Sequence, residues 1–371
     1  MTVSVSEGAV PVAAPVSAAV GHGRMPLIDA LKAVASQMIV LHHLAFYGPM
    51  TDWTQLLAPG TVEWFSRHAR MAVQVFLVVS GFLAVRALAP LGHLQAVNPG
   101  ALLRKRYISI ALPYVVALLV AVGANELASQ WMTHSSLSTA APDLWQFVAH
   151  ALLLHGLLEM ESLSAGVWYV AIDFQLYALL LAVLWLGQRW AAGPPRPTLP
   201  RQPWAAPGLV VTVAAASLLL FNRDSGWDEW GVYFFGAYAL GGLAWWTCQP
   251  HARGWPLAGV VGLVGLALVV DFRERVALAA AVALLLGVSH ARGWLYRWPR
   301  NPGVAYLGRI SYGVFLMNFP VALVVNAWFT RFAPADPWVQ TAGVGVAWLA
   351  CGLAGAAFHH WVEAPLRRWR F

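Results

Sequence analysis

Charged side chains are scarce in this sequence. Only 11% of its 371 residues are Asp, Glu, Lys or Arg, whereas 59% are hydrophobic. A soluble domain carries roughly 25% charged residues, so the chain has too few polar side chains to cover a water-exposed globule. The 20 tryptophans fit a protein with two membrane interfaces, where indole rings gather at the level of the lipid headgroups. The composition therefore predicts an all-α integral membrane protein.

Cysteine is rare as well, and basic residues do not gather into one patch. Cys248 and Cys351 both fall in apolar runs, which predicts buried thiols and supplies too few ligands for zinc. We therefore expect no metal centre. The net charge of +7 comes from basic residues scattered between apolar runs, whereas a nucleic-acid-binding protein concentrates them on one face. Nucleic acid is thus excluded as an expected partner.

No basic residue precedes Arg24 in an N-terminal stretch that is rich in Ala, Val, Pro and Gly. A secretory signal begins with positive charge and continues into an unbroken apolar segment, and Pro11 and Pro15 interrupt the only candidate. We expect a disordered cytoplasmic tail over 1–24 and a single membrane domain over 25–371. The proline-dense stretch 193–207 is predicted to be a cytoplasmic linker between two bundles of helices.

About ten apolar segments are long enough to cross a membrane as helices, which takes roughly 20 residues. These segments are 27–47, 70–88, 107–124, 166–187, 206–222, 230–248, 255–271, 275–290, 304–328 and 338–361. The apolar segment 145–158 is shorter and holds His150 and His155. Its placement has to be decided by the charges that flank the spans.

The distribution of Lys and Arg favours 145–158 as a segment that does not cross. With that choice, most cations fall on one side of the membrane, together with Arg24 and the C-terminal arginines. The other side receives Arg67, Arg70, Arg223, Arg273, Arg275 and Arg331. Because cytoplasmic loops carry an excess of Lys and Arg, we expect both termini in the cytoplasm and a re-entrant or interfacial element at 145–158.

The strongest chemical signal lies in the first span, which holds Asp29, Lys32, His42 and His43. Ionisable groups are costly inside a bilayer and mark functional sites. On a helix, Lys32 and His43 lie within about 20° of one face and about 16 Å apart along the axis. Asp29 lies close to the same stripe, whereas His42 points about 100° away from His43.

This stripe has a cationic end near the cytoplasm and an imidazole deeper in the membrane. Coenzyme A has a matching shape, since its phosphates could pair with Lys32 while its long arm reaches inward. His43 could then act as a general base, because only histidine has an unperturbed pKa near neutrality. The alternative at this point is that His43 is a structural residue bonded to a neighbouring helix.

Further patches follow the first span in a fixed order. They are VQVFLVVSGFL (Val73 to Leu83), RKRYISIALPY (Arg104 to Tyr114), WYVAIDFQLYAL (Trp168 to Leu179), RISYGVFLMNFPV (Arg309 to Val321) and VEAPLRRW (Val362 to Trp369). Together with Asp29, Lys32 and His43, they resemble the acyltransferase-3 family of membrane acyltransferases. No single motif is specific for the family, but the order of the motifs along about ten spans is specific. The resemblance covers the chain from Met25 to its end.

The resemblance implies an enzyme that transfers acyl groups other than aminoacyl groups. Members of that family move acetyl or other short acyl groups from cytoplasmic acyl-CoA onto hydroxyls of envelope glycans or related acceptors, in the bacterial inner membrane. Acyl-CoA is implied as a donor substrate, with no permanently bound cofactor, and a glycan or lipid-linked acceptor and membrane lipid as the other partners. The implied catalytic residues are His43, Asp29 and Asp173, and the implied acyl-CoA-binding residues are Lys32, Arg106, Ser311 and Tyr312.

Several positions depart from the family pattern. Lys32 stands where the family often has arginine, Ile110 where it has arginine, Asn318 where it has histidine, and Asp173 where it has glutamate. Asparagine cannot titrate, so the acid–base work falls to His43. For Asp173 the alternative is a structural bond to a neighbouring cation or tryptophan.

Two other function classes stay open from the sequence. A polytopic transporter is one, since charges on a helix face also mark ion pathways. A non-catalytic subunit that retains the fold is the other, and Ile110 and Asn318 favour it. Ser80 and Gly81 are expected to allow close helix packing rather than to react. The acceptor, the acyl group and the oligomeric state are not fixed by the sequence.

Overall fold

The computed structural model describes residues 24–95, 98–132, 141–191, 205–249, 254–298 and 301–368. These ranges contain helices, turns and loops but no β-strand, which confirms the all-α prediction. The predicted tail over 1–24 lies outside the described residues except for Arg24. Most of the predicted linker 193–207 also lies outside them.

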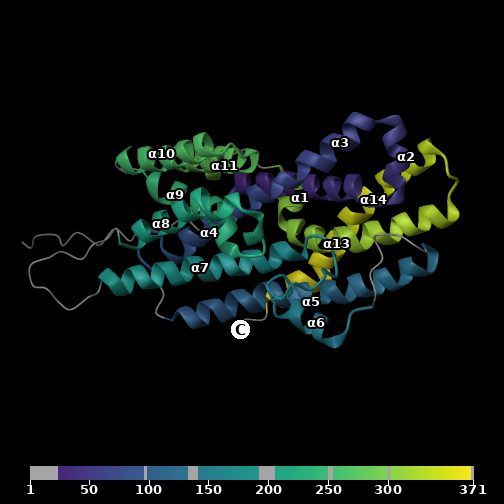
Figure 1. The fold of residues 1–371 in the computed structure, drawn as a ribbon, viewed down its shortest axis with the longest axis horizontal. Coiled ribbons are helices and arrows are strands. Elements are labelled where there is room, and N and C mark those ends of the chain that lie inside the picture. The colour runs from purple at the N-terminus through teal and green to yellow at the C-terminus, as the bar shows by residue number, and fades with distance from the viewer. Residues whose placement is uncertain are drawn as a thin grey trace, which may run out of the picture.

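Each of the ten predicted spans corresponds to a helix (Figure 1). The first half of the chain forms α1 (Pro26–Phe46), α2 (Pro49–Leu57), α3 (Pro59–His68), α4 (Val73–Leu88), α5 (Pro99–Trp131), α6 (Leu144–Ala151) and α7 (Val167–Ala191). The second half forms α8 (Ala205–Leu219), α9 (Gly231–Thr247), α10 (Gly254–Val270), α11 (Glu274–Ala291), α12 (Trp294–Arg297), α13 (Pro302–Phe332), α14 (Pro337–Phe358) and α15 (Ala364–Arg368).

Among the described residues, 8 helices are long and apolar enough to cross a membrane. One of them joins α3 and α4 through the 3₁₀ turn Ala69–Ala72 into a continuous rod, Pro59–Leu88. The two remaining predicted spans are α9 and α10, with 17 residues each. A helix of that length rises about 26 Å, near the lower limit for crossing the hydrocarbon core. The protein is therefore a multi-pass membrane protein.

The segment around α6 does not cross, as predicted. α6 has 8 residues and rises only about 12 Å. Asp143 caps its first turn by accepting a hydrogen bond from the Gln146 amide at 2.6 Å. The Tyr107 hydroxyl on α5 donates to the Ala151 carbonyl at its other end, at 2.9 Å. Irregular backbone at membrane depth must be covered by protein or line a cavity. The chain that follows α6 is packed against other helices and also lines a cavity.

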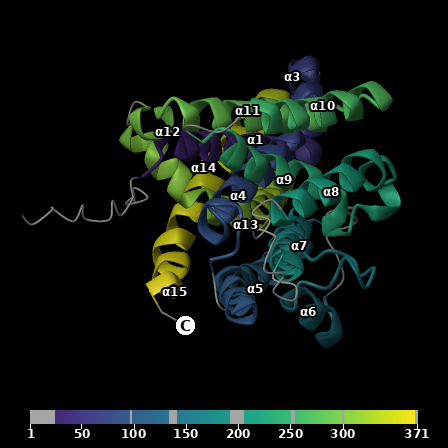
Figure 2. The ribbon, with the colours of Figure 1, turned by 90° about the vertical axis from the view of Figure 1, so that its left-hand side faces the viewer.

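Two helices organise the packing (Figure 2). α13 packs against α1, α5 and α14, while α9 packs against α4, α8 and α11. The contact between α4 and α9 is very close, because a Cβ atom on Gly81 would lie 1.8 Å from the Tyr238 carbonyl oxygen. A Cβ atom on Gly241 would lie 1.9 Å from the Val78 carbonyl oxygen. The predicted packing role of Gly81 is thus confirmed, since only glycine lets the backbones approach this far.

The start of α1 and the π-helical turn that precedes α15 lie at the same end of the bundle. Arg24 donates to the Ala305 carbonyl, near the start of α13, at 2.7 Å. Glu363, in the π-helical turn His359–Glu363 after α14, interacts electrostatically with Lys32 on α1.

Candidate active site

His43 lies near the C-terminal end of α1, and its side chain is buried. Its ring nitrogen Nδ1 is 2.5 Å from the Oδ1 atom of Asn318 on α13. The Asn318 amide is oriented by its own helix, because its Nδ2 donates to the Phe315 carbonyl at 2.6 Å and to the Val314 carbonyl at 3.3 Å. Its oxygen must therefore face His43, so the proton of the imidazole resides on Nδ1.

This tautomer gives His43 the chemistry of a base. With Nδ1 donating to Asn318, the other ring nitrogen, Nε2, carries a lone pair that can accept a proton. A base whose partner fixes both its tautomer and its ring orientation is the arrangement used in nucleophile–base–orienter sites. Asn318 thus orients the His43 ring through its amide oxygen, a contact that does not require it to titrate. From the sequence alone, we could conclude only that Asn318 cannot act as an acid or a base.

His43 lines a cavity of about 690 Å³, which is within the usual range for ligand pockets. The cavity lies where the ends of α1, α9 and α11 meet the segment before α7. Its charged and aromatic lining includes His42, Tyr47, Arg70, Trp168, Asp228, Tyr233, Phe234, Arg273, Glu274 and Arg275. Such a mixture of aromatic faces and polar side chains suits a ligand that has hydroxyl groups.

Charged side chains at the rim of this cavity determine its electrostatic potential. Arg273 donates to Asn222 Oδ1 at 2.7 Å and lies 3.4 Å from Asp271, and burial lowers the pKa of its guanidinium. Arg70 is exposed, and the described residues offer it no hydrogen-bond or ion-pair partner. Burial raises the pKa of the Tyr47 hydroxyl, which keeps it protonated as a donor. The sequence identified these cations only as topology signals, because the packing that gathers them is tertiary.

The segment before α7 approaches His43 closely. A Cβ atom on Gly166 would lie 3.5 Å from His43 Cε1 and 3.2 Å from Phe315 Cζ. Gly166 also has a φ of +85°, a conformation that favours glycine. His150 fixes the same segment, since its Nε2 accepts a hydrogen bond from the Leu163 amide at 3.2 Å. His150 thus supports the wall of the site.

His155 stacks on His150, with ring centroids 4.2 Å apart. Burial, with a further contribution from His150, lowers the pKa of His155 to about 4, so this pair stays neutral at physiological pH. Across the described ranges there is no group of three or more His, Cys, Asp or Glu side chains that could hold a metal ion. The two rings pack against each other in the loop that follows α6.

The cationic end of the α1 stripe lies about 16 Å from His43 along the helix axis. Lys32 is partly buried there and interacts with Asp29, Glu363 and Arg367. Glu363 is almost fully buried and pairs with His359 at 2.8 Å and with Arg367 at 2.5 Å. These contacts occur at a π-helical turn, a feature frequent at functional sites.

Asp29 belongs to this same end and not to the surroundings of His43. It pairs with Arg24 at 2.6 Å, and fourteen helical residues, about 21 Å, separate it from His43. The structure thus separates two of the residues that the sequence placed in one catalytic set. Asp29 is positioned to organise the cationic end.

Arg106 on α5 and Asp173 on α7 form an ion pair in which Asp173 is buried and Arg106 is partly buried. The guanidinium carbon of Arg106 also lies 5.3 Å from the centre of the Tyr177 ring. Among the described residues, the Arg106 Nε atom has no hydrogen-bond partner. Asp173 therefore orients Arg106, which matches the structural alternative for this residue.

Ser311 and Tyr312 are turned toward neighbouring backbone. The Ser311 hydroxyl donates to the Gly308 carbonyl of its own helix at 3.0 Å. The Tyr312 hydroxyl donates to the Ile110 carbonyl of α5 at 3.0 Å, close to Pro113, which interrupts the hydrogen bonding of that helix. Tyr312 therefore joins α13 to α5, whereas the Ser311 hydroxyl stays within α13.

A family model described as an acyltransferase domain matches residues 26–357. The match begins at the start of α1 and ends in the last turn of α14, so it includes His43, Asn318, Arg106 and Asp173 and stops before Glu363. A search of curated proteins and a search of solved structures found no match.

Proposed function

The chain belongs to the acyltransferase-3 family, and from this membership we propose that it transfers an acetyl or other short acyl group from acyl-CoA to a hydroxyl of an envelope glycan or related acceptor. The family and the fold show that the protein is an acyltransferase with membrane-spanning helices. The donor, the acceptor and the bacterial inner membrane as location are the proposed part. The observation that carries the proposal is His43, held as a base by Asn318 at the wall of a large cavity with aromatic and polar lining.

The two ends of α1 divide the substrates between two sides of the membrane. The end with Lys32 carries most of the cations, which favours the cytoplasm and suits the phosphates of acyl-CoA. The end with His43 opens into the cavity lined by Arg70, Arg273 and Arg275, which the same rule assigns to the outer side. The acceptor hydroxyl would therefore reach His43 from outside, while the thioester would reach it from the cytoplasm.

The reaction that this arrangement supports is a direct transfer. The acceptor oxygen attacks the thioester carbonyl carbon while its proton passes to Nε2 of His43. The new C–O bond forms, the C–S bond breaks, and the proton moves from His43 to the departing sulfur. The products are an ester and free coenzyme A, so atoms and charges balance without a further reactant. The Nδ1–Asn318 bond stabilises the transient imidazolium.

Turnover by the purified protein in liposomes tests this proposal. With labelled acetyl-CoA and a glycan fraction from the envelope, we expect release of free coenzyme A thiol that depends on the acceptor. The label should appear as an alkali-labile ester on the glycan by mass spectrometry. Thiol release without any labelled acceptor, or uptake of an intact solute into the liposomes, would contradict the proposed activity.

Removing the charge at Lys32 should weaken donor binding specifically. We expect Lys32→Ala to raise the KM for acetyl-CoA by roughly tenfold, because a hydrogen bond to a charged group contributes about 1.5 kcal/mol. Acetyl-pantetheine has no phosphates, so its turnover should be the same in Lys32→Ala and in the unmodified protein. Lys32→Arg keeps the charge and should bind acetyl-CoA normally. An unaltered KM in Lys32→Ala would exclude the phosphate contact.

A further inference from the structure

The large cavity contains one arginine that the described part of the protein leaves unpaired. Three arginines line this cavity, namely Arg70, Arg273 and Arg275. Arg273 and Arg275 both donate to Asn222, to its Oδ1 atom and to its carbonyl oxygen, at 2.7 Å each. The guanidinium carbon of Arg275 also lies 4.9 Å from the centre of the Tyr233 ring. Arg70, in contrast, is exposed and has no hydrogen bond or ion pair with any described residue.

Arg70 lies on the same side of the cavity as the two histidines of α1. It reaches the cavity from the 3₁₀ turn between α3 and α4, and this turn packs against α1. Its charge interacts electrostatically with His42. The rings of His42 and His43 lie 5.5 Å apart, and both line the cavity. The unpaired cation is therefore close to the place where the acceptor hydroxyl must lose its proton.

Two carboxylates line the cavity from other elements. Asp228 precedes α9, and Glu274 lies in the first turn of α11, where the positive end of the helix favours its charge. Neither of them forms an ion pair within the described ranges. An ionised carboxylate can only accept hydrogen bonds and a guanidinium can only donate them. The two acids therefore suit sugar hydroxyls, whereas Arg70 suits an anion.

An aromatic pair provides an apolar surface in the same cavity. Trp168 is stacked on Phe234, with ring centroids 5.7 Å apart and an interplanar angle of 30°. Both side chains line the cavity. Ligand pockets combine aromatic walls with a few polar groups that fix the orientation of the ligand. The C–H face of a sugar ring is an apolar surface that can pack against such a wall.

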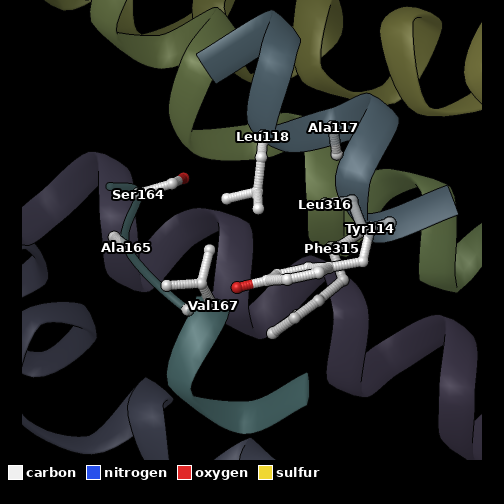
Figure 3. A pocket seen from close by; sticks show the side chains of 9 residues that line it. Tyr114, Ala117, Leu118, Ser164, Ala165, Val167, Phe315 and Leu316 are labelled. Carbon is white, nitrogen blue, oxygen red and sulfur yellow. The ribbon is translucent and has the colours of Figure 1, made fainter. Parts of the chain in front are cut away.

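The loop that leads into α7 closes the cavity on one side. Ser164 and Ala165 line the cavity there, on the loop just before Val167 (Figure 3). A neighbouring space lined by the same loop has only about 10 Å³, which is room for at most one water molecule. The acceptor therefore has to be held in the large cavity itself, which Arg70 lines.

We propose that Arg70 selects acceptors that carry a negatively charged substituent, a carboxylate or a phosphate, next to the hydroxyl that receives the acyl group. This inference rests on the proposed acyltransferase function. The guanidinium of Arg70 donates two parallel hydrogen bonds to the charged substituent, the sugar ring lies against Trp168, and the hydroxyl faces Nε2 of His43. A neutral glycan leaves Arg70 without a counterion and binds less tightly.

The test measures binding to the complete protein in phosphatidylcholine nanodiscs, without any acyl donor. The probes are three oligosaccharides of equal length, namely a glucuronic acid oligomer, a phosphorylated glucose oligomer and a neutral glucose oligomer. By isothermal titration calorimetry, we expect both charged probes to bind about tenfold more tightly than the neutral one, the difference that one charge-assisted hydrogen bond supplies. Raising the salt concentration should reduce this difference, because salt screens exposed charges.

Variants assign the preference to one side chain. Arg70→Gln should abolish the preference for charged probes, and Arg70→Lys should keep part of it, because lysine retains the charge but not the planar fork. Arg67→Gln is the matched control, since Arg67 is exposed on α3, pairs with Glu63 at 2.9 Å and does not line the cavity. Trp168→Leu should weaken the binding of all three probes by a similar factor, because packing against the ring does not depend on charge.

The binding and transfer measurements can fail separately. Equal binding of charged and neutral probes by the unmodified protein, or an unaltered preference in Arg70→Gln, would overturn selection by Arg70 and leave its charge to lipid headgroups. The acyltransferase function would stand in that case as long as acceptor-dependent thiol release continues. Absence of transfer from acetyl-CoA to every acceptor would instead overturn the proposed function, while a preference that depends on Arg70 would still establish an anion site.

Discussion

Replacement of His43 by glutamine is expected to lower kcat for acyl transfer by about 10²- to 10⁴-fold, the contribution of a positioned general base. Glutamine can still donate a hydrogen bond to Asn318 Oδ1, so the partner in α13 is not left unpaired. What is lost is the lone pair of Nε2 and with it the acceptor of the hydroxyl proton. The measurement is the initial rate of acceptor-dependent thiol release, with size-exclusion chromatography in detergent to confirm folding.

His42→Gln is the matched control for this experiment. His42 is the next residue on the same helix and lines the same cavity, but its Nδ1 faces the Phe65 carbonyl at 3.3 Å. We expect a loss of only a few-fold there, because the acceptor still has its base. An equal or greater loss in His42→Gln would transfer the catalytic assignment from His43 to His42. Full activity in His43→Gln would show that His43 is not the general base.

Replacement of Asn318 by leucine is expected to reduce kcat by up to about 10⁴-fold, the loss found when a catalytic imidazole is held in the wrong tautomer. Leucine has a similar size but cannot accept the Nδ1 proton. The imidazole would then lose its orientation and its preference for a free Nε2. The effect should appear in kcat rather than in the KM for acetyl-CoA, and the pH–rate profile should change with it.

Asn326 on α13 provides a control of the same residue type. It is buried like Asn318 and also donates to its own helix, at 2.9 Å to the Ala322 carbonyl, but its Oδ1 accepts from the Met50 amide instead of a histidine. Asn326→Leu should therefore affect stability without a comparable change in kcat. If both leucine variants lose activity in parallel with their folded fraction, the Asn318 effect is structural and its positioning role is wrong.

The membrane architecture could be predicted from the sequence because its signals are local. Apolar length defined the spans, and the excess of Lys and Arg on one side showed that 145–158 does not cross. The alignment of Lys32 and His43 on one face of α1 also followed from helix periodicity alone. Family membership was inferred from motif order, and the match over residues 26–357 confirms it.

The partners of the site residues could not be predicted, because they depend on contacts between distant helices. Asn318 stood out in the sequence as the loss of a titratable group, yet in the structure its amide oxygen orients His43. Asp29 shares the face of α1 with His43 but pairs with Arg24 instead. Arg273 and Arg275 were counted as loop cations, although the fold brings them to the cavity of His43.

The packing of α1 has a consequence for the electrical insulation of the membrane. A protein that accepts one substrate from each side would short-circuit the proton gradient if its two binding spaces merged into one aqueous path. Between Lys32 and His43, α1 packs against α13 and buries Ala33, Ala35, Ser36, Ile39 and Val40. Under the proposed function, this stretch has to admit the thin arm of acyl-CoA while it keeps water and ions from following.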